Sequence, residues 1–240
     1  MAKKKITKVL IIGSNSFSAG SLINLLISKN FKVFAISRSI LNPKKFTAFK
    51  TSGKNFSFKK MDINKDYKKI SSYINKIKPK YILNYASQSM VGESWDNPID
   101  WYQTNSLSMV KLYYAISKVK FNCRLIHIST PEVYGNLSKI TFENNEYNPT
   151  TPYAASRVTA DHFLSLLFSQ KKINYSSVRS SNVYGEHQRL YRIVPKTIFF
   201  ILKKKKLNLH GGGTSKRNFI HIDDVSLATL KVMISGKNGE

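Results

Sequence analysis

The chain has 240 residues, which is enough for one large domain with a sizeable core, and no apolar run approaches the ~20 residues of a membrane span. Its single cysteine, Cys123, excludes an intramolecular disulfide and a zinc site, which favours a reducing, cytoplasmic location. The formal net charge of +26 admits a nucleic-acid partner, but the lysines are scattered and no stretch interleaves them with aromatic residues, so nucleic-acid binding is not the favoured interpretation.

Short apolar runs alternate with helix-period segments over most of the chain. We expect strands at residues 8–13, 31–37, 56–63, 81–87, 124–129 and 174–180, and helices at residues 17–29, 66–77, 99–118 and 152–170. This alternation with short connections predicts an α/β protein with a doubly wound parallel sheet of the Rossmann type. Further helices are expected near 191–204 and from 223. We expect a nucleotide-binding domain over residues 1–180 and a smaller lobe over residues 181–240, interleaved with the last elements of the sheet.

The sequence GSNSFSAG, residues 13–20, directly follows the first expected strand. Its small residues have the spacing of a dinucleotide-binding loop, in which the pyrophosphate rests on the amino terminus of the following helix. A tight turn would also select small residues, but the position in the first strand–helix turn favours a dinucleotide. The expected cofactor contacts in this loop are Gly13, Asn15, Ser16, Phe17 and Ser18.

The second expected strand ends in Ser37 and Arg38, where NAD-binding folds usually have a carboxylate for the ribose 2′-hydroxyl. A serine and a guanidinium can instead hold a 2′-phosphate, so we expect NADP rather than NAD. The alternative is an ordinary surface arginine. Asp62 and Ile63, after the third expected strand, could contact the adenine, although a plain Asp turn is equally consistent.

Tyr153 and Arg157 are four residues apart on an expected helix and share one face. Tyrosine is a poor base at neutral pH, and a fixed cation one turn away favours its phenolate form. Such a pair alone is usually a surface contact, but together with a nucleotide loop and Thr130 it forms a candidate catalytic arrangement. Glu132 lies beside Pro131 just past the fifth expected strand, a position typical of ligand-binding residues in doubly wound sheets.

The chain resembles the extended short-chain dehydrogenases/reductases, and within them the nucleotide-sugar epimerase/4,6-dehydratase family, which includes GDP-mannose and dTDP-glucose 4,6-dehydratases. The motifs that carry the resemblance occur in the family's order over nearly the whole chain. They are GSNSFSAG, MDI, NYASQSMVGES, STPEVYG, TPYAASR, RSSNVYGEHQ and GGGTSKRNFIHIDDV.

The resemblance implies a bound nicotinamide dinucleotide and a nucleotide-diphosphate hexose substrate. It also implies that Tyr153 takes the proton from the sugar 4-hydroxyl, that Thr130 hydrogen-bonds the same oxygen, and that Arg157 holds the nicotinamide ribose. Glu132 would remove the C5 proton, which favours a 4,6-dehydratase over a 4-epimerase. The other implied contacts are Tyr85, Ala86 and Ser87 at the cofactor and Ser89, Glu93, Asn182, Arg192 and Arg217 at the substrate.

Several features depart from the family pattern, among them Met90, where many relatives have His. Arg157 replaces the usual lysine, and Pro131 stands where glucose-type dehydratases have an acidic residue, so that Glu132 would have to serve as base and then as acid. The chain also stops before the last part of the expected substrate lobe. A 4-epimerase and a non-catalytic dinucleotide-binding protein with a basic RNA-binding surface stay open as alternatives.

The remaining expectations concern assembly and histidines. The helix faces around residues 99–118 and 152–170 could form the contact of a homodimer, or of a dimer of dimers, as in relatives. His127 lies inside an expected strand and is interpreted as a core histidine. The other histidines show no metal-ligand pattern, so we expect no metal site.

Overall fold

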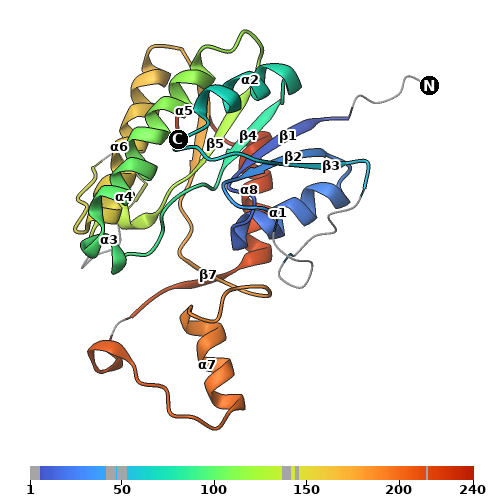
Figure 1. Cartoon of the computed structure of the whole chain (residues 1–240). Coiled ribbons are helices and arrows are strands. Elements are labelled where there is room, and N and C mark those ends of the chain that lie inside the picture. The colour runs from blue at the N-terminus through green and yellow to red at the C-terminus, as the bar shows by residue number, and fades with distance from the viewer. Residues whose placement is uncertain (1–5, 42–46, 48–52, 137–141, 144–145, 215) are drawn as a thin grey trace.

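Six parallel strands form one sheet in the order β3-β2-β1-β4-β5-β6 (Figure 1). The computed structural model describes residues 6–41, 47, 53–136, 142–143, 146–214 and 216–240. The strands are β1 Lys8–Ile12, β2 Lys32–Ser37, β3 Phe56–Lys60, β4 Tyr81–Asn84, β5 Arg124–Ile128 and β6 Asn174–Val178. All neighbouring strands run parallel, so their carboxyl ends lie along one edge. The predicted doubly wound sheet is confirmed.

The central strands are continuous apolar runs because both faces of the sheet are covered. In β1, Leu10 and Ile12 pack into one core, and Val9 and Ile11 pack into the other. Helices α2 (Tyr67–Ile77), α5 (Ser108–Ser117) and α6 (Pro152–Ser169) cover the first face, whereas α1 (Phe17–Ser28) and α8 (Ile222–Ser235) cover the second (Figure 1).

The helix expected over residues 99–118 is present, but it is not uniform. It consists of α4 (Pro98–Tyr102), a π-helical turn (Gln103–Leu107) and α5, and the short α3 (Glu93–Asp96) precedes it. The π-turn buries Asn105, whose side-chain amide donates to Gln88 O and to Ser156 Oγ, each at 3.0 Å. The wider turn therefore connects this helix to α6 and to the chain after β4.

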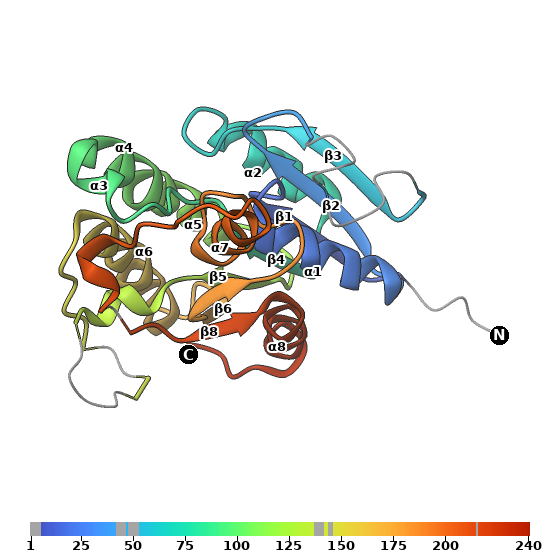
Figure 2. The ribbon, with the colours of Figure 1, turned by 90° about the horizontal axis from the view of Figure 1, so that it is seen from below.

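Beyond β6 the chain leaves the sheet and later returns to it. Strands β7 (Asn182–Tyr184) and β8 (Phe219–His221) form a separate parallel pair, and α7 (Ile193–Leu202) lies away from the main sheet (Figure 1). Figure 2, seen from below, shows α7 end-on in front of the sheet. Helix α8 then packs beside α1, where Ser226 Oγ donates to Ser21 Oγ at 3.0 Å. The division into domains near residue 180 stays a prediction.

Candidate functional site

The turn from β1 into α1 has the geometry of a dinucleotide loop. Gly13 adopts a φ of 80°, and a Cβ at this position would lie 2.4 Å from the backbone nitrogen of Ala86, so only glycine fits. Ser16 is the N-cap of α1 and accepts from the backbone N–H of Ala19 at 3.3 Å. Phe17 and Ser18 begin the helix, whose first N–H groups have no partner within the helix and therefore suit a phosphate. The Ser14 hydroxyl is buried there with no hydrogen-bond partner, which also fits a pyrophosphate.

The end of β2 lies beside this loop. Asn15 Nδ2 donates to Ser39 Oγ at 2.9 Å and to Ile40 O at 2.7 Å, and so joins the two loops. Ser37 is buried, whereas Arg38 is exposed and carries the positive charge at the tip. This edge therefore presents a guanidinium next to the dinucleotide loop.

The residues expected to contact the adenine and the rest of the cofactor differ in their burial and in their hydrogen bonds. Asp62 accepts from the backbone N–H of Asn64 at 2.9 Å and forms a side-chain turn that leads into α2. Ile63 and Tyr85 are buried in the two cores, and burial raises the pKa of Tyr85. Ala86 N donates to Asn84 Oδ1 at 3.1 Å. The backbone from Tyr85 to Ala86 passes directly over Gly13, and the exposed Ser87 follows it.

Tyr153 and Arg157 lie on the inner face of α6. Thr151 caps this helix by accepting from Ala154 N at 3.1 Å, and Ser94 in α3 accepts from the backbone N–H of Tyr153 at 3.1 Å. Tyr153 is 8% exposed and Arg157 is 2% exposed, so the pair is not a surface contact. The Arg157 guanidinium donates to the carbonyl of Ile128 at the end of β5.

Thr130 and Glu132 occupy the turn that follows β5. Pro131 begins a 3-10 turn, Pro131–Tyr134, where its missing N–H has no consequence. Thr130 Oγ1 accepts from Glu132 N at 3.2 Å, which fixes the turn. Because this turn packs against α6, the carboxyl end of β5 gathers Thr130 and Glu132 near the helix that carries Tyr153 and Arg157.

A buried polar network next to this pair was not found from the sequence. Its centre is Asp161, which is 3% exposed and lies four residues after Arg157 on α6. Asp161 Oδ1 contacts His127 Nε2 at 2.8 Å, and Oδ2 accepts from Ser129 Oγ and from Arg179 Nη2, each at 2.8 Å. Since an ionised carboxylate only accepts hydrogen bonds, His127 Nε2 carries the proton. The interpretation of His127 as a core histidine is confirmed.

The network continues from His127 to β4. With Nε2 protonated, His127 Nδ1 accepts from the Tyr113 hydroxyl, at 2.5 Å, and that hydroxyl accepts from Asn84 Nδ2 at 2.8 Å. Burial raises the pKa of Tyr113, so this tyrosine stays neutral. The chain of hydrogen bonds therefore links the segment above Gly13 to α6 through groups that do not change charge near neutral pH.

Burial and neighbouring charges set the ionisation of the network. Burial lowers the pKa of His127 below its usual value, and the hydrogen bond and charge of Asp161 offset this only in part. Burial alone would raise the pKa of Asp161, but the hydrogen bond from His127 and the charges of Arg179 and Arg157 together bring it well below its usual value. At neutral pH, Asp161 is therefore ionised and His127 is neutral.

The five expected substrate residues lie around the smaller lobe and the loop after β4. Arg192 Nη2 lies 3.5 Å from Ser89 Oγ, which connects the start of α7 to the loop after β4. Asn182 begins β7 and donates through Nδ2 to Asn218 O at 3.1 Å, next to the exposed Arg217. Glu93 is exposed at the start of α3.

Among the described residues, no group of three His, Cys, Asp or Glu side chains is arranged to hold a metal ion. None of the helices in that part of the chain combines the length and apolar character needed to span a membrane.

Residues 10–240 match the family described as GDP-mannose 4,6 dehydratase. The chain belongs to this family. Among curated relatives, human dTDP-D-glucose 4,6-dehydratase is 35% identical over 160 residues, which are 66% of this chain and 45% of the human protein. This chain thus spans less than half of the length of that relative.

Two solved structures share the fold over nearly the whole chain. The dTDP-glucose 4,6-dehydratase of Bacillus anthracis, in complex with NAD, has a TM-score of 0.82 at 24% identity, and the match covers 98% of this chain and 74% of that one. UDP-glucuronic acid 4-epimerase of Bacillus cereus, in complex with UDP-glucuronic acid and NAD, has a TM-score of 0.84 at 26% identity, over 97% and 74% of the two chains. The solved neighbours of this chain therefore include a nucleotide-sugar dehydratase and a nucleotide-sugar epimerase.

Proposed function

We propose that this chain carries out the chemistry of an NADP-dependent nucleotide-hexose 4,6-dehydratase. The observation that supports it is the grouping at the end of β5. Thr130 and Glu132 lie on one fixed turn. This turn packs against α6, the helix on which Tyr153 and Arg157 are buried. The family of the chain is consistent with this chemistry.

The proposed roles follow from the chemistry of each group. Tyr153, as phenolate, takes the proton of the sugar 4-hydroxyl, Thr130 hydrogen-bonds the same oxygen, and the charge of Arg157 stabilises the phenolate. The nicotinamide dinucleotide supplies a hydride acceptor for C4 and a hydride donor for C6.

Glu132 has two tasks in this proposal. A 4-ketone acidifies the proton on C5, and the carboxylate removes that proton. Because Pro131 has no acidic group, the protonated Glu132 then gives its proton to the 6-hydroxyl, which leaves as water. Addition of a hydride at C6 and of a solvent proton at C5 would then give the 4-keto-6-deoxy sugar, and Tyr153 would release to solvent the proton that it took from the 4-hydroxyl.

The cofactor preference rests on the end of β2. Ser37 and Arg38 stand where a carboxylate would bind the ribose 2′-hydroxyl of NAD, and an exposed guanidinium suits a 2′-phosphate better. Both solved neighbours named above hold NAD. Our proposal therefore gives this chain a different cofactor from theirs.

A 4-epimerase is the second candidate, because one solved neighbour is a 4-epimerase. Epimerisation needs a base and a hydride acceptor at C4 but no base for C5. The carboxylate of Glu132 on the Thr130 turn therefore favours the dehydratase.

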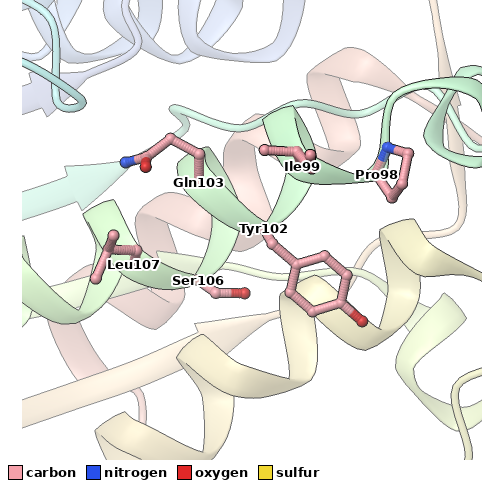
Figure 3. A pocket seen from close by; sticks show the side chains of 6 residues that line it. All are labelled: Pro98, Ile99, Tyr102, Gln103, Ser106 and Leu107. Atoms are coloured by element: carbon pink, nitrogen blue, oxygen red, sulfur yellow. The ribbon is translucent and has the colours of Figure 1, made fainter.

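We also propose that a second copy of this chain packs against α4, the π-turn and α6. This surface exposes Ile99, Tyr102 and Leu107, with exposed fractions of 81%, 43% and 47%, and Leu166 on α6. Figure 3 shows the hollow on this surface, with α6 alongside; its lining residues are Pro98, Ile99, Tyr102, Gln103, Ser106 and Leu107. Sedimentation should give a dimer for the protein and a monomer for Leu107→Arg.

The decisive test of the function is a substrate panel. The protein is incubated with NADP and with GDP-, UDP-, dTDP- or CDP-hexoses, and the products are analysed by mass. We expect the loss of one water from at least one substrate and no loss with Tyr153→Phe. A change of sugar configuration without loss of mass would instead establish the epimerase.

A further inference from the structure

The buried cluster around Asp161 contains more positive than negative charge. Arg157 and Arg179 are both cations, Asp161 is an anion and His127 is neutral. Arg179 Nη2 lies 2.8 Å from Asp161 Oδ2. In the described part of the chain, by contrast, no carboxylate lies within ion-pair distance of Arg157, which is 2% exposed. One net positive charge thus remains inside the protein, one helical turn from Tyr153.

Asp161 has the sequence position of a partner for Arg157. It lies four residues further along α6, which is the spacing of a helical ion pair. However, both carboxylate oxygens have other partners: Oδ1 contacts His127, while Oδ2 accepts from Ser129 and Arg179. Arg157 donates instead to the carbonyl of Ile128, a neutral acceptor.

Arg179 is itself held firmly in this place. Its guanidinium carbon lies 5.5 Å from the ring centres of both Tyr134 and Tyr147, and Nη2 donates to the Tyr147 hydroxyl at 2.8 Å. Burial alone would lower the pKa of Arg179, but the charge of Asp161 raises it above its usual value. The Arg179–Asp161 ion pair is therefore a fixed feature of the fold.

We propose that Arg179 is a positioning residue that tunes the site: by occupying the carboxylate of Asp161, it leaves the charge of Arg157 available to stabilise the phenolate of Tyr153. Arg179 acts through Asp161 and Arg157 rather than on substrate. The benefit to catalysis rests on the proposed role of Tyr153 as the base, whereas the electrostatic effect on Tyr153 does not.

Other titratable groups also face this cluster, from α5, β5 and the turn packed against α6. Tyr113 on α5 and Tyr147 beside Arg179 have pKa values raised by burial, and the pKa of His127 on β5 is lowered by burial, so all three stay neutral. Glu132 lies on the turn packed against α6 and is the same in every variant below. The charges that the test alters are therefore those of Asp161 and Arg179.

Ionisation of Tyr153 can be measured directly, without any substrate. The protein is labelled with ¹³C at the tyrosine Cζ and titrated by NMR, and the Tyr153 signal is identified by its loss in Tyr153→Phe. Arg179→Gln removes the net positive charge of the cluster, so we expect the Tyr153 midpoint to move to higher pH by about half a unit or more. Asp161→Asn adds one positive charge, and we expect a shift to lower pH.

The opposite signs separate tuning from mere loosening of the site, which would move both midpoints toward that of a free tyrosine. Two controls complete the design. Arg179→Lys keeps the charge and should stay near the wild-type midpoint, and the double variant Arg179→Gln/Asp161→Asn restores the net charge and should return toward it. Equal or absent shifts in variants that keep the wild-type circular dichroism spectrum would overturn the proposal. If Arg179→Gln does not fold, an unchanged or raised midpoint in Asp161→Asn overturns it.

The same variants distinguish a failure of this proposal from a failure of the proposed function. If the function is correct, the acid limb of the pH–rate profile moves with the NMR midpoint in each variant. If the midpoints move as expected but no nucleotide sugar is converted, the tuning by Arg179 stands and the dehydratase proposal fails.

Discussion

Ser94 in α3 accepts a hydrogen bond from the backbone N–H of Tyr153, with 3.1 Å between Oγ and N. The first N–H groups of a helix have no partner within the helix, so a side chain from another element must satisfy them when they are buried. Ser94 itself is buried and donates to Val91 O at 2.6 Å. The start of α6, and with it the position of Tyr153, therefore depends on a four-residue helix some sixty residues earlier in the chain.

Ser94→Ala should lower the free energy of unfolding by about 1–3 kcal/mol, because it leaves a buried N–H without an acceptor. Urea unfolding measures this change. Ser117→Ala is the matched control, because the half-buried Ser117 makes a solvent-exposed hydrogen bond within its own helix, to Tyr114 O. Equal stability of the two variants would show that Ser94 does not hold α6.

Arg38→Ala should remove most of the preference for NADP over NAD. Loss of a hydrogen bond to a charged group typically costs ~1.5–3 kcal/mol, so NADP affinity should fall roughly tenfold or more while NAD affinity stays the same. Isothermal calorimetry with each cofactor measures this. Lys29→Ala, at the far end of α1, removes an equal charge and should leave both affinities unchanged. Tighter binding of NAD than of NADP to the unmodified protein would contradict the proposal.

Glu132→Gln should separate the two halves of the proposed reaction. Tyr153 is intact in this variant, so substrate should still reduce the bound cofactor, which absorbance reports. Product should fall by ~10²–10⁴-fold, the usual effect of removing a positioned general base, and C5 hydrogen should not exchange in heavy water. Turnover near the normal rate would show that Glu132 is only a residue of the turn, and the epimerase would then be favoured.

His127 should make the protein less stable as the pH falls. Burial lowers its pKa in the folded state, so between the unfolded value of about 6.5 and the lower folded value the unfolded chain binds the extra proton. The contribution of His127 to the free energy of unfolding is fully present above about pH 6.5. Below that pH it declines by at most about 1.4 kcal/mol per pH unit, the limit for one proton.

Urea unfolding at pH 7.0, 6.0 and 5.0 tests this dependence. His127→Gln should be less stable at pH 7 but should lose less stability on acidification. His187→Gln, at an exposed position, should keep the wild-type slope. A wild-type slope in His127→Gln would show that another group controls the acid sensitivity.

The sheet was predictable from the sequence because its strands are buried on both faces and therefore are continuous apolar runs between helices. The π-turn was not predictable, since Gln103–Leu107 fits an ordinary helix in sequence. Its geometry depends on the contacts of Asn105 with Gln88 and Ser156, which the fold brings together.

In the candidate site, too, some features follow from the sequence and others depend on contacts that only the fold creates. The shared face of Tyr153 and Arg157 follows from their spacing, and the same rule extended by one turn leads to Asp161. Arg179 could not be found in this way. Its place beside Ser129 depends on the register between β5 and β6, which sets Ile128 opposite Val178.

The packing of α8 on α1 has a consequence for biosynthesis. The face of α1 that includes Leu22, Ile23 and Leu26 shares a core with Leu230 and Met233 of α8, about two hundred residues later. Ribosomes add about 5–20 residues per second, so α8 is synthesised on the order of ten to forty seconds after α1. During that time, α1 and its face of the sheet are not covered by α8. The nascent chain therefore exposes an apolar surface until α8 has emerged, and we expect chaperone binding to map to residues 17–28 during that time.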